Sequence, residues 1–193
     1  IVFGDWSSDV CSSDLKKTGK LAGNSIAITS MSNLGLHKAM QKAGINVEIT
    51  AVGDRYVIER MKEKNLNVGG EQSGHVIFMD YATTGDGIIT ALHVLKLMVE
   101  QKQPLTELAA FMHEFPQKHT NINVSKKVPI EELPSLQKVI SDAEAEMGDN
   151  GRTVVRYSGT ENKLRILVEA GDGALVDKWS ENIAAFVKKE LCK

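Results

Sequence analysis

Two short polar segments of this sequence hold the side chains best suited to chemistry. The first, Gly-Gly-Glu-Gln-Ser-Gly-His at residues 69–75, places a carboxylate, an amide, a hydroxyl and an imidazole after two glycines. This set of donors and acceptors suits sugar hydroxyls. Glu71, Ser73 and His75 alternate, so in an extended stretch they would project to one side. His75 could also transfer a proton near neutral pH, although solvated loop side chains are the alternative interpretation.

The second segment, Arg-Tyr-Ser-Gly-Thr-Glu-Asn at residues 156–162, has a further arginine three positions after it. Guanidinium groups, hydroxyls and a glycine N–H together suit a phosphate. An exposed turn could carry the same small residues for geometry alone. Two arginines on one loop would repel each other without an anion between them, which favours phosphate binding. The candidate phosphate-binding residues are Arg156, Ser158, Gly159, Thr160 and Arg165.

Other polar residues have weaker functional patterns. The segment Thr-Thr-Gly-Asp-Gly at residues 83–87 could bind an anion or metal, but Asp86 more simply caps the following helix. Asp54 is expected to cap a helix in the same way, while Arg55 could turn toward a binding cleft. The histidines other than His75 have no metal-ligand spacing, so we expect no metal site in this sequence.

Composition excludes several classes of protein. The chain of 193 residues has a net charge of −2 and no basic stripe with interleaved aromatic residues, so nucleic acid is not an expected partner. The longest apolar stretch, residues 88–99, is too short and too interrupted to span a membrane. Cys11 and Cys192 lie near opposite ends without metal-like spacing. A reduced, cytoplasmic setting is therefore expected.

Strand and helix patterns alternate over residues 16–115. This alternation predicts a three-layer α/β domain, with a mixed sheet and flanking helices. The expected strands are 25–29, 47–52, a short one before Gly69, and 76–79, and the expected helices are 34–43 closed by Gly44, 55–64, and about 85–100. The last helix has an apolar stripe that we expect to face the core, formed by Ile88, Ile89, Leu92, Leu95 and Val99.

Residues 116–193 have a different order of expected strands and helices. Strands are expected at 120–124, 154–157 and 164–170, and helices at 133–147 and 175–191, with Trp179, Ile183, Phe186 and Val187 on one side of the last helix. Two hairpin-connected strands among these elements predict a small α+β domain with an antiparallel sheet. The second polar segment then lies in the turn of that hairpin.

Residues 1–15 do not match the chain that follows. Ser-Ser-Asp occurs twice in a short acidic tract without a sustained helical or strand period. The tract lacks the basic start and apolar run of a signal peptide. It resembles translated adapter or junction sequence, so we expect a non-native, disordered leader.

Five segments together resemble the bacterial phosphoglucosamine mutase family, a branch of the α-D-phosphohexomutases. They are the two polar segments, Met-Ser-Asn-Leu-Gly-Leu at 31–36, Val-Gly-Asp-Arg-Tyr-Val at 52–57, and Asp-Tyr-Ala-Thr-Thr-Gly-Asp-Gly at 80–87. The resemblance begins near Leu15 and implies the third and fourth domains of a four-domain enzyme. Residues 16–115 would then form the sugar-binding domain and residues 116–193 the phosphate-binding domain.

The resemblance implies specific roles. Glu71 and Ser73 would contact sugar hydroxyls, the second segment would hold the non-reacting phosphate, and His75 would lie near the reacting end with an acid/base role. Family enzymes interconvert glucosamine 6-phosphate and glucosamine 1-phosphate through a sugar 1,6-bisphosphate, which feeds UDP-N-acetylglucosamine and cell-wall synthesis. They use a phosphoserine and Mg²⁺. The implied partners are a hexosamine phosphate, the N-terminal domains of the same enzyme and a second copy in a homodimer.

The sequence departs from the family in one respect. It contains neither a Ser-His-Asn-Pro phosphoserine loop nor an Asp-Gly-Asp-Gly-Asp metal loop. The resemblance therefore implies a C-terminal part that recognises substrate but is inactive alone. Two alternatives stay open: a fragment of a phosphomannomutase or phosphoglucomutase, and a free-standing phosphosugar-binding module without catalysis.

Overall fold

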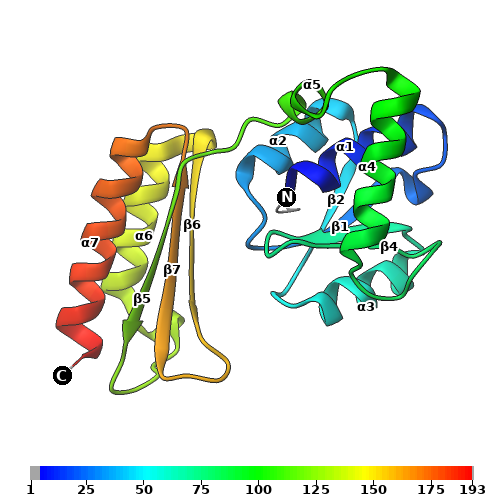
Figure 1. Ribbon diagram of the computed structural model, residues 1–193. Helices are drawn as coiled ribbons and strands as arrows, with labels where there is room; N and C mark the ends of the chain where they lie inside the picture. Colours follow the sequence, from blue (N-terminus) through cyan, green and yellow to red (C-terminus); the bar gives the residue numbers. More distant parts are fainter. Residues whose placement is uncertain (1–4, 193) are drawn as a thin grey trace. The chain divides into compact units, whose positions relative to one another are not determined.

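The computed structural model describes residues 5–192, which form two compact units (Figure 1). Unit 1 extends to Glu114, and unit 2 begins at Phe115. Unit 1 is built on a mixed four-stranded sheet, and unit 2 on a separate antiparallel sheet of three strands. The predicted fold class, an α/β domain followed by a small α+β domain, is therefore confirmed.

The sheet of unit 1 has the order β2-β1-β3-β4. The central strand β1 is parallel to both β2 and β3, whereas β3 and β4 form an antiparallel hairpin. The strands are β1 (Ser25–Thr29), β2 (Asn46–Thr50), β3 (Val68–Glu71) and β4 (His75–Phe78). β1, β2 and β4 lie within two residues of the predicted strands, whereas β3 extends three residues past its predicted end before Gly69. β2 ends early because the chain turns at residues 51–53 into the next helix.

Helices cover both faces of this sheet (Figure 1). Along β1, Ile26 and Ile28 join the core on one face, while Ala27 packs with Val57 and Met61 on the other. This alternation is the two-residue period of a strand buried on both sides. The first face carries α1 (Asp5–Lys17), α2 (Leu34–Ala43) and α4 (Gly87–Gln101), and the second carries α3 (Asp54–Lys64).

The predicted orientation of α4 is wrong. Its expected core stripe is mostly exposed, with Ile88 at 75% and Val99 at 76% of their accessible surface, and Leu92 and Leu95 above half. Thr90, Val94 and Leu97 are buried instead. Apolar residues occur around most of this helix, so their spacing does not select one face.

Helix caps follow the expected chemistry in two of three cases. The Asp86 carboxylate caps α4 by accepting hydrogen bonds from the N–H groups of Ile88 and Ile89 at 2.8 and 2.9 Å. The C-terminal cap of α2 is Gly44, with φ of 64°, as predicted. Asp54, however, is not the cap of α3: Gly53 holds that position, and Asp54 lies in the first turn.

The predicted disorder of residues 1–15 is wrong for the part that the structure describes. From Asp5 onward these residues form α1, and Val10 and Cys11 join the core of unit 1 with Leu15 packed against it. These few apolar contacts hold the helix against the core. The sequence of α1 has no apolar period, so the helix could not be predicted from spacing alone. Residues 1–4 lie outside the described residues.

The same helix also buries polar side chains, which are Ser7, Ser8, Asp9 and Ser12. Burial raises the pKa of Asp9 to about 7, and a hydrogen bond from Ser13 only partly opposes that rise. One carboxylate oxygen of Asp9 has no hydrogen-bond partner. Burial, with Asp14 and Asp9 nearby, also raises the pKa of Cys11 to about 12, so its thiol stays protonated and unreactive.

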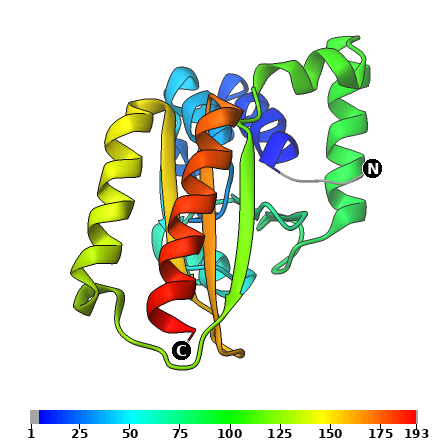
Figure 2. The ribbon, with the colours of Figure 1, turned by 90° about the vertical axis from the view of Figure 1, so that its left-hand side faces the viewer.

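Unit 2 has helices on one face of its sheet only (Figure 2). The strand order is β5-β7-β6, and every pair is antiparallel. Leu164 and Ile166 of the central strand pack against Ile183 and Val187 of the last helix, whose predicted apolar side is confirmed. The elements are β5 (Gln117–Asn123), α6 (Pro134–Met147), β6 (Gly151–Tyr157), β7 (Lys163–Ala170) and α7 (Gly173–Leu191).

Short helical segments connect these elements, and they are η1 (Ala22–Asn24), α5 (Leu105–Leu108), η2 (Ala109–Phe111), η3 (Ile130–Glu132) and η4 (Gly148–Asn150). None of the helices between residues 5 and 192 has the length and apolar character needed to cross a membrane.

Candidate functional site

The first polar segment forms the tight turn between β3 and β4. Glu71 ends β3 and is the cross-strand partner of His75, which begins β4. Gly74 makes the turn possible, because its φ of 100° is unfavourable for other residues and its N–H donates to the Glu71 carbonyl at 3.1 Å. The predicted group is therefore brought together, but by a hairpin turn and not by alternation along one strand.

A chain of hydrogen bonds joins the three functional side chains of this turn. Ser73 Oγ lies 3.1 Å from Glu71 Oε2 and 2.9 Å from His75 Nδ1. A carboxylate can only accept, so the single hydroxyl proton of Ser73 goes to Glu71. His75 then donates from Nδ1 to Ser73, and its Nε2 keeps a lone pair that could take a proton.

Two neighbouring loops support this turn. The backbone N–H of Gly53 donates to Glu71 Oε1 at 3.2 Å, and the N–H of Asp86 donates to the carbonyl of Val76 at 3.2 Å. Arg55 does not contact this turn among the described residues, and its predicted cleft contact stays a prediction. Its guanidinium instead pairs with Glu59 at 2.8 Å, one turn along α3, and its side chain is 81% exposed.

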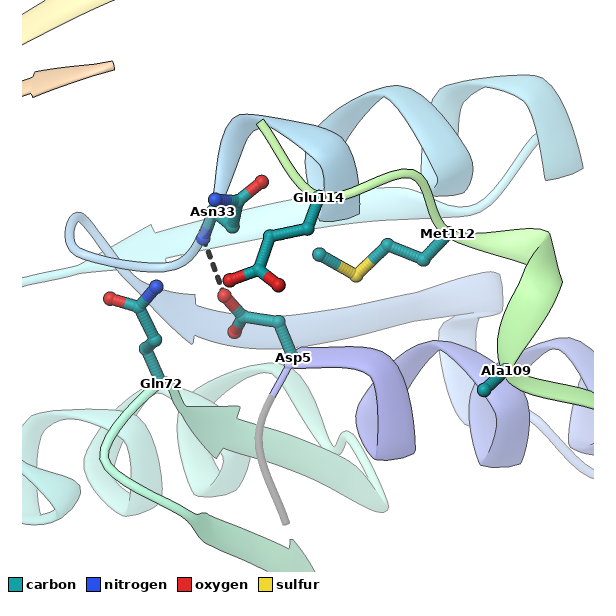
Figure 3. Close-up of a pocket in the computed structure, with 6 residues that line it drawn as sticks. All are labelled: Asp5, Asn33, Gln72, Ala109, Met112 and Glu114. Atoms are coloured by element: carbon teal, nitrogen blue, oxygen red, sulfur yellow. Dashed lines mark hydrogen bonds between the residues drawn. The ribbon is translucent and has the colours of Figure 1, made fainter. Parts of the chain in front are cut away.

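A cavity of about 250 Å³ lies beside the first turn, near the carboxyl ends of β1 and β3 (Figure 3). The connections of a doubly wound sheet diverge at such an edge, which is where these folds bind ligands. Asp5 accepts a hydrogen bond from the N–H of Asn33 there, and the side chains of Gln72 and Glu114 extend into the same space. The cavity therefore presents acceptors and an amide, which suit hydroxyl or amino groups.

The second polar segment joins β6 to β7 in unit 2. Arg156 and Arg165 are direct cross-strand partners, so their side chains project from the same face of the sheet. Helices cover the other face, and the Arg165 side chain is 42% exposed at the end of the hairpin. The Glu161 carboxylate lies 3.3 Å from Arg165, so one negative group already accompanies this pair.

Ser158 is the centre of the second turn. It is 2% exposed, and its N–H donates to the Lys163 carbonyl at 2.8 Å. Its hydroxyl oxygen accepts from Arg165 at 3.3 Å and from the Glu161 N–H at 3.3 Å. Hydrogen bonds from Lys163 and, less strongly, Arg165 lower the pKa of Glu161, so this carboxyl stays ionised beside the arginine.

The five predicted phosphate-binding residues thus lie at one end of one hairpin, and the three predicted sugar-binding or catalytic residues lie in another. Two further cations at the second turn were not predicted. Lys163 pairs with Glu161, and Lys127 donates from Nζ to the Ser158 carbonyl at 2.8 Å. Lys127 lies 31 residues earlier in the chain than Ser158, and no local motif connects it to the turn.

The residues present do not form a magnesium site. Mg²⁺ requires several oxygen ligands in near-octahedral geometry. Between residues 5 and 192, no group of three or more His, Cys, Asp or Glu side chains is placed to hold a metal ion. Asp86, the acidic residue of the segment considered for this role, caps α4 instead.

Two family models match this chain. "Phosphoglucomutase/phosphomannomutase, alpha/beta/alpha domain III" matches residues 4–115, and "Phosphoglucomutase/phosphomannomutase, C-terminal domain" matches residues 120–186. The chain therefore belongs to the phosphoglucomutase/phosphomannomutase family, and the resemblance to phosphohexomutases is confirmed.

Curated relatives give a more specific similarity. Proteins named phosphoglucosamine mutase are 44% identical in Chlamydia caviae, 46% in Bacillus subtilis and 47% in Listeria innocua, each over 191 residues. These matches cover 99% of this chain but only 42–43% of each relative. The chain thus spans less than half the length of the curated relatives that it matches.

Solved structures confirm the fold. N-acetylphosphoglucosamine mutase of Aspergillus fumigatus matches with a TM-score of 0.83 at 19% identity, over 100% of this chain and 44% of that one. An N-acetylglucosamine-phosphate mutase, described as a member of the α-D-phosphohexomutase superfamily, matches with a TM-score of 0.77 at 24% identity, over 97% and 44%. At these identities the likeness concerns the fold alone.

Proposed function

We propose that this chain is the substrate-recognition part of a phosphoglucosamine mutase, an isomerase that interconverts glucosamine 6-phosphate and glucosamine 1-phosphate. The name of the curated relatives supports this reaction. The chain spans only the C-terminal two of the family's domains by its matches, so the reaction is proposed for the longer protein.

The observation that carries the proposal is the facing pair Arg156 and Arg165 at the end of the β6–β7 hairpin. A phosphate between them would accept charge-assisted hydrogen bonds from both. Ser158, fixed beside Arg165, would contribute its hydroxyl, and Thr160 is exposed at the same turn. We assign this turn to the phosphate that does not react.

The turn in unit 1 is proposed to bind the sugar. Glu71 and Ser73 would exchange their mutual hydrogen bond for bonds to sugar hydroxyls, which have the same donors and acceptors. His75, with its Nε2 lone pair, would act as acid or base on the reacting hydroxyl. The cavity lined by Gln72 and Asp5 adjoins this turn and would admit the ring substituents.

The remaining chemistry belongs to the longer protein. One Aspergillus fumigatus N-acetylphosphoglucosamine mutase structure is a complex with GlcNAc-6P and magnesium, and another is a complex with glucose 1,6-bisphosphate. We extend both groups, and the phosphoserine, to the complete form of the present protein. Cytoplasmic location and a homodimer are parts of the same proposal. This chain alone should give no turnover in a coupled assay with Mg²⁺ and a sugar bisphosphate.

Binding of glucosamine 6-phosphate to the chain, measured by isothermal titration calorimetry, tests the proposal. Arg156→Ala should weaken binding by about 1.5–3 kcal/mol, the typical contribution of a hydrogen bond to a charged group. That corresponds to a rise in Kd of roughly 10- to 150-fold. In the longer protein the same change should raise KM, because the contact exists in both ground and transition states.

Arg60→Ala is the matched control, since Arg60 is an arginine of α3 whose guanidinium pairs with Glu48 at 2.8 Å and with Glu63 at 3.2 Å. It should leave the Kd unchanged. A wild-type chain that does not bind the sugar phosphate, or an Arg156→Ala variant that binds as tightly as Arg60→Ala, would contradict the proposal.

A further inference from the structure

A short segment after β5, residues 124–128, lies beside the phosphate-binding turn; we call it the strap. Its backbone is fixed at both ends. The N–H of Val124 donates to the Asn162 carbonyl at 3.0 Å, and the N–H of Ser125 donates to the Leu191 carbonyl at 2.8 Å. At the other end, the Tyr157 hydroxyl donates to the Val128 carbonyl at 2.7 Å and accepts from its N–H at 3.2 Å.

Lys127 is the residue of the strap that reaches the turn. Its ammonium donates to the Ser158 carbonyl at 2.8 Å. Because the strap is held on both sides of Lys127, the direction of this side chain follows from the fold and not from a freely moving loop. Lys126, its neighbour, is exposed and has no hydrogen bond or ion pair to any residue within 5–192.

The contact at the Ser158 carbonyl also orients the next N–H. In a trans peptide the C=O and the following N–H point in opposite directions. An ammonium on the Ser158 oxygen therefore directs the Gly159 N–H to the other side of the turn. The turn is uncrowded at Gly159 itself, because a Cβ placed on its Cα would meet no atom within 4 Å. The Gly159 N–H has no hydrogen-bond partner among the described residues.

We propose that Lys127 is a positioning residue for the phosphate: it holds the Ser158–Gly159 peptide so that the Gly159 N–H points at the anion. The positive charge of Lys127 also adds to those of Arg156, Lys163 and Arg165, among which Glu161 supplies one carboxylate. Such a peptide N–H, polarised by a cation on its carbonyl, is a strong donor to a phosphate oxygen. The inference rests on the proposed function of this turn.

The test uses the 193-residue chain and glucosamine 6-phosphate as the probe. Lys127→Gln should raise the Kd about 5- to 20-fold, less than Arg156→Ala, because Lys127 acts on the phosphate only through the Gly159 N–H. Lys126→Gln, which removes the same charge one residue away, should change the Kd less than twofold. Lys127→Arg, which keeps a charged donor, should restore most of the affinity.

A second measurement separates positioning from a merely structural role. In the wild-type chain the NMR signal of the Gly159 amide proton should move downfield when the sugar phosphate is added. At saturating ligand, Lys127→Gln should lose most of that movement and Lys126→Gln should keep it. If Lys127→Gln also lowers Tm, the Gly159 amide shift at saturating ligand still distinguishes a positioning role from a merely structural one.

The two proposals fail in different ways. A wild-type chain without affinity for the sugar phosphate would reject the proposed function itself. A wild-type chain that binds, together with a Lys127→Gln variant matching Lys126→Gln in both Kd and Gly159 shift, would overturn only the role of Lys127.

Discussion

Asp9 of unit 1 and Glu169 of unit 2 are both fully buried carboxylates, but their surroundings are opposite. Glu169 lies on the central strand β7 and accepts a hydrogen bond from its cross-strand partner Arg152, with Nε and Oε2 2.8 Å apart. Asp9 lies on α1, where its hydrogen-bond donor is the neutral Ser13 at 3.3 Å. Burial raises the pKa of Asp9 to about 7.

The difference is that the buried charge of Glu169 has a cation as its partner, whereas the buried carboxylate of Asp9 has only a neutral donor. A buried charge is costly unless a cation and hydrogen bonds replace its water. Glu169 has such a cation built into the pairing of two strands, so sheet formation and ion pairing occur together. Asp9 was brought into the core by the apolar contacts of its helix, and its own contribution opposes folding.

The largest effect on stability is expected when Arg152, the cation paired with Glu169, is replaced. Arg152→Met leaves the carboxylate of Glu169 buried without this partner, and should lower the free energy of unfolding of unit 2 by about 3–5 kcal/mol. Urea titration followed by the amide NMR signals of each unit measures this separately for the two sheets. The signals of unit 1 should keep their midpoint.

The double variant Arg152→Met/Glu169→Leu is the control for that experiment. It removes both charges and should recover most of the lost stability, because an apolar pair of similar volume is often as stable as a buried ion pair. A double variant as unstable as Arg152→Met would show that the packing of Arg152, and not the charge of Glu169, causes the loss.

Removal of the Asp9 carboxylate should raise the free energy of unfolding, in contrast to the loss expected for Arg152→Met. A rise in the pKa of Asp9 from 3.8 to about 7 corresponds to at most about 4 kcal/mol of lost stability once the group is ionised. Asp9→Ala removes this cost and adds no volume, so unit 1 should become more stable at pH 8. The same NMR-detected urea titration measures the gain.

The pH dependence of this gain follows from the direction of the pKa change. Below about pH 4 the group is protonated in both the folded and unfolded states, and the carboxylate costs nothing extra. Between pH 4 and 7 the folded state binds more protons, so the wild-type chain loses stability as the pH rises. Asp9→Ala should therefore gain little at pH 4 and most at pH 8, and a gain independent of pH would contradict the assignment.

Asp142→Ala is the matched control, because Asp142 also occupies a helix interior but is exposed and pairs with Lys138 at 3.2 Å. Its effect should stay below about 1 kcal/mol at both pH values. An effect as large as that of Asp9→Ala would mean that helix propensity, and not burial, explains the gain.

The α1 region also marks where sequence reasoning fails. Strand and helix periods located β1, α2, β7 and α7 within about two residues, because in these elements the apolar spacing and the buried face agree. In α1 the buried positions include serines and aspartates, so the sequence has no apolar period that would predict the helix. The proposed non-native origin of residues 1–15 stays a prediction, and the family model matches from residue 4 onward.

The sequence could group candidate site residues to the extent that they are adjacent in the chain. The turns at 71–75 and 156–165 were found because each concentrates its polar groups in one hairpin. Lys127 was missed because a different loop brings it to Ser158 through tertiary contacts. Arg55 pairs with Glu59 on its own helix, and its predicted cleft contact stays a prediction.

The smallest effect is expected for an ion pair that is exposed in the same unit as Glu169. Lys178 of α7 and Glu146 of α6 lie 2.6 Å apart, closer than Arg152 and Glu169, but their side chains are 48% and 40% exposed. Water already solvates both groups, so Glu146→Gln should cost only about 0.2–1 kcal/mol. In 0.5 M NaCl that cost should shrink further, because salt screens exposed charges, while the cost of Arg152→Met should persist. A Glu146→Gln variant as destabilised as Arg152→Met, or equally affected with and without salt, would mean that distance and not burial decides what an ion pair contributes here.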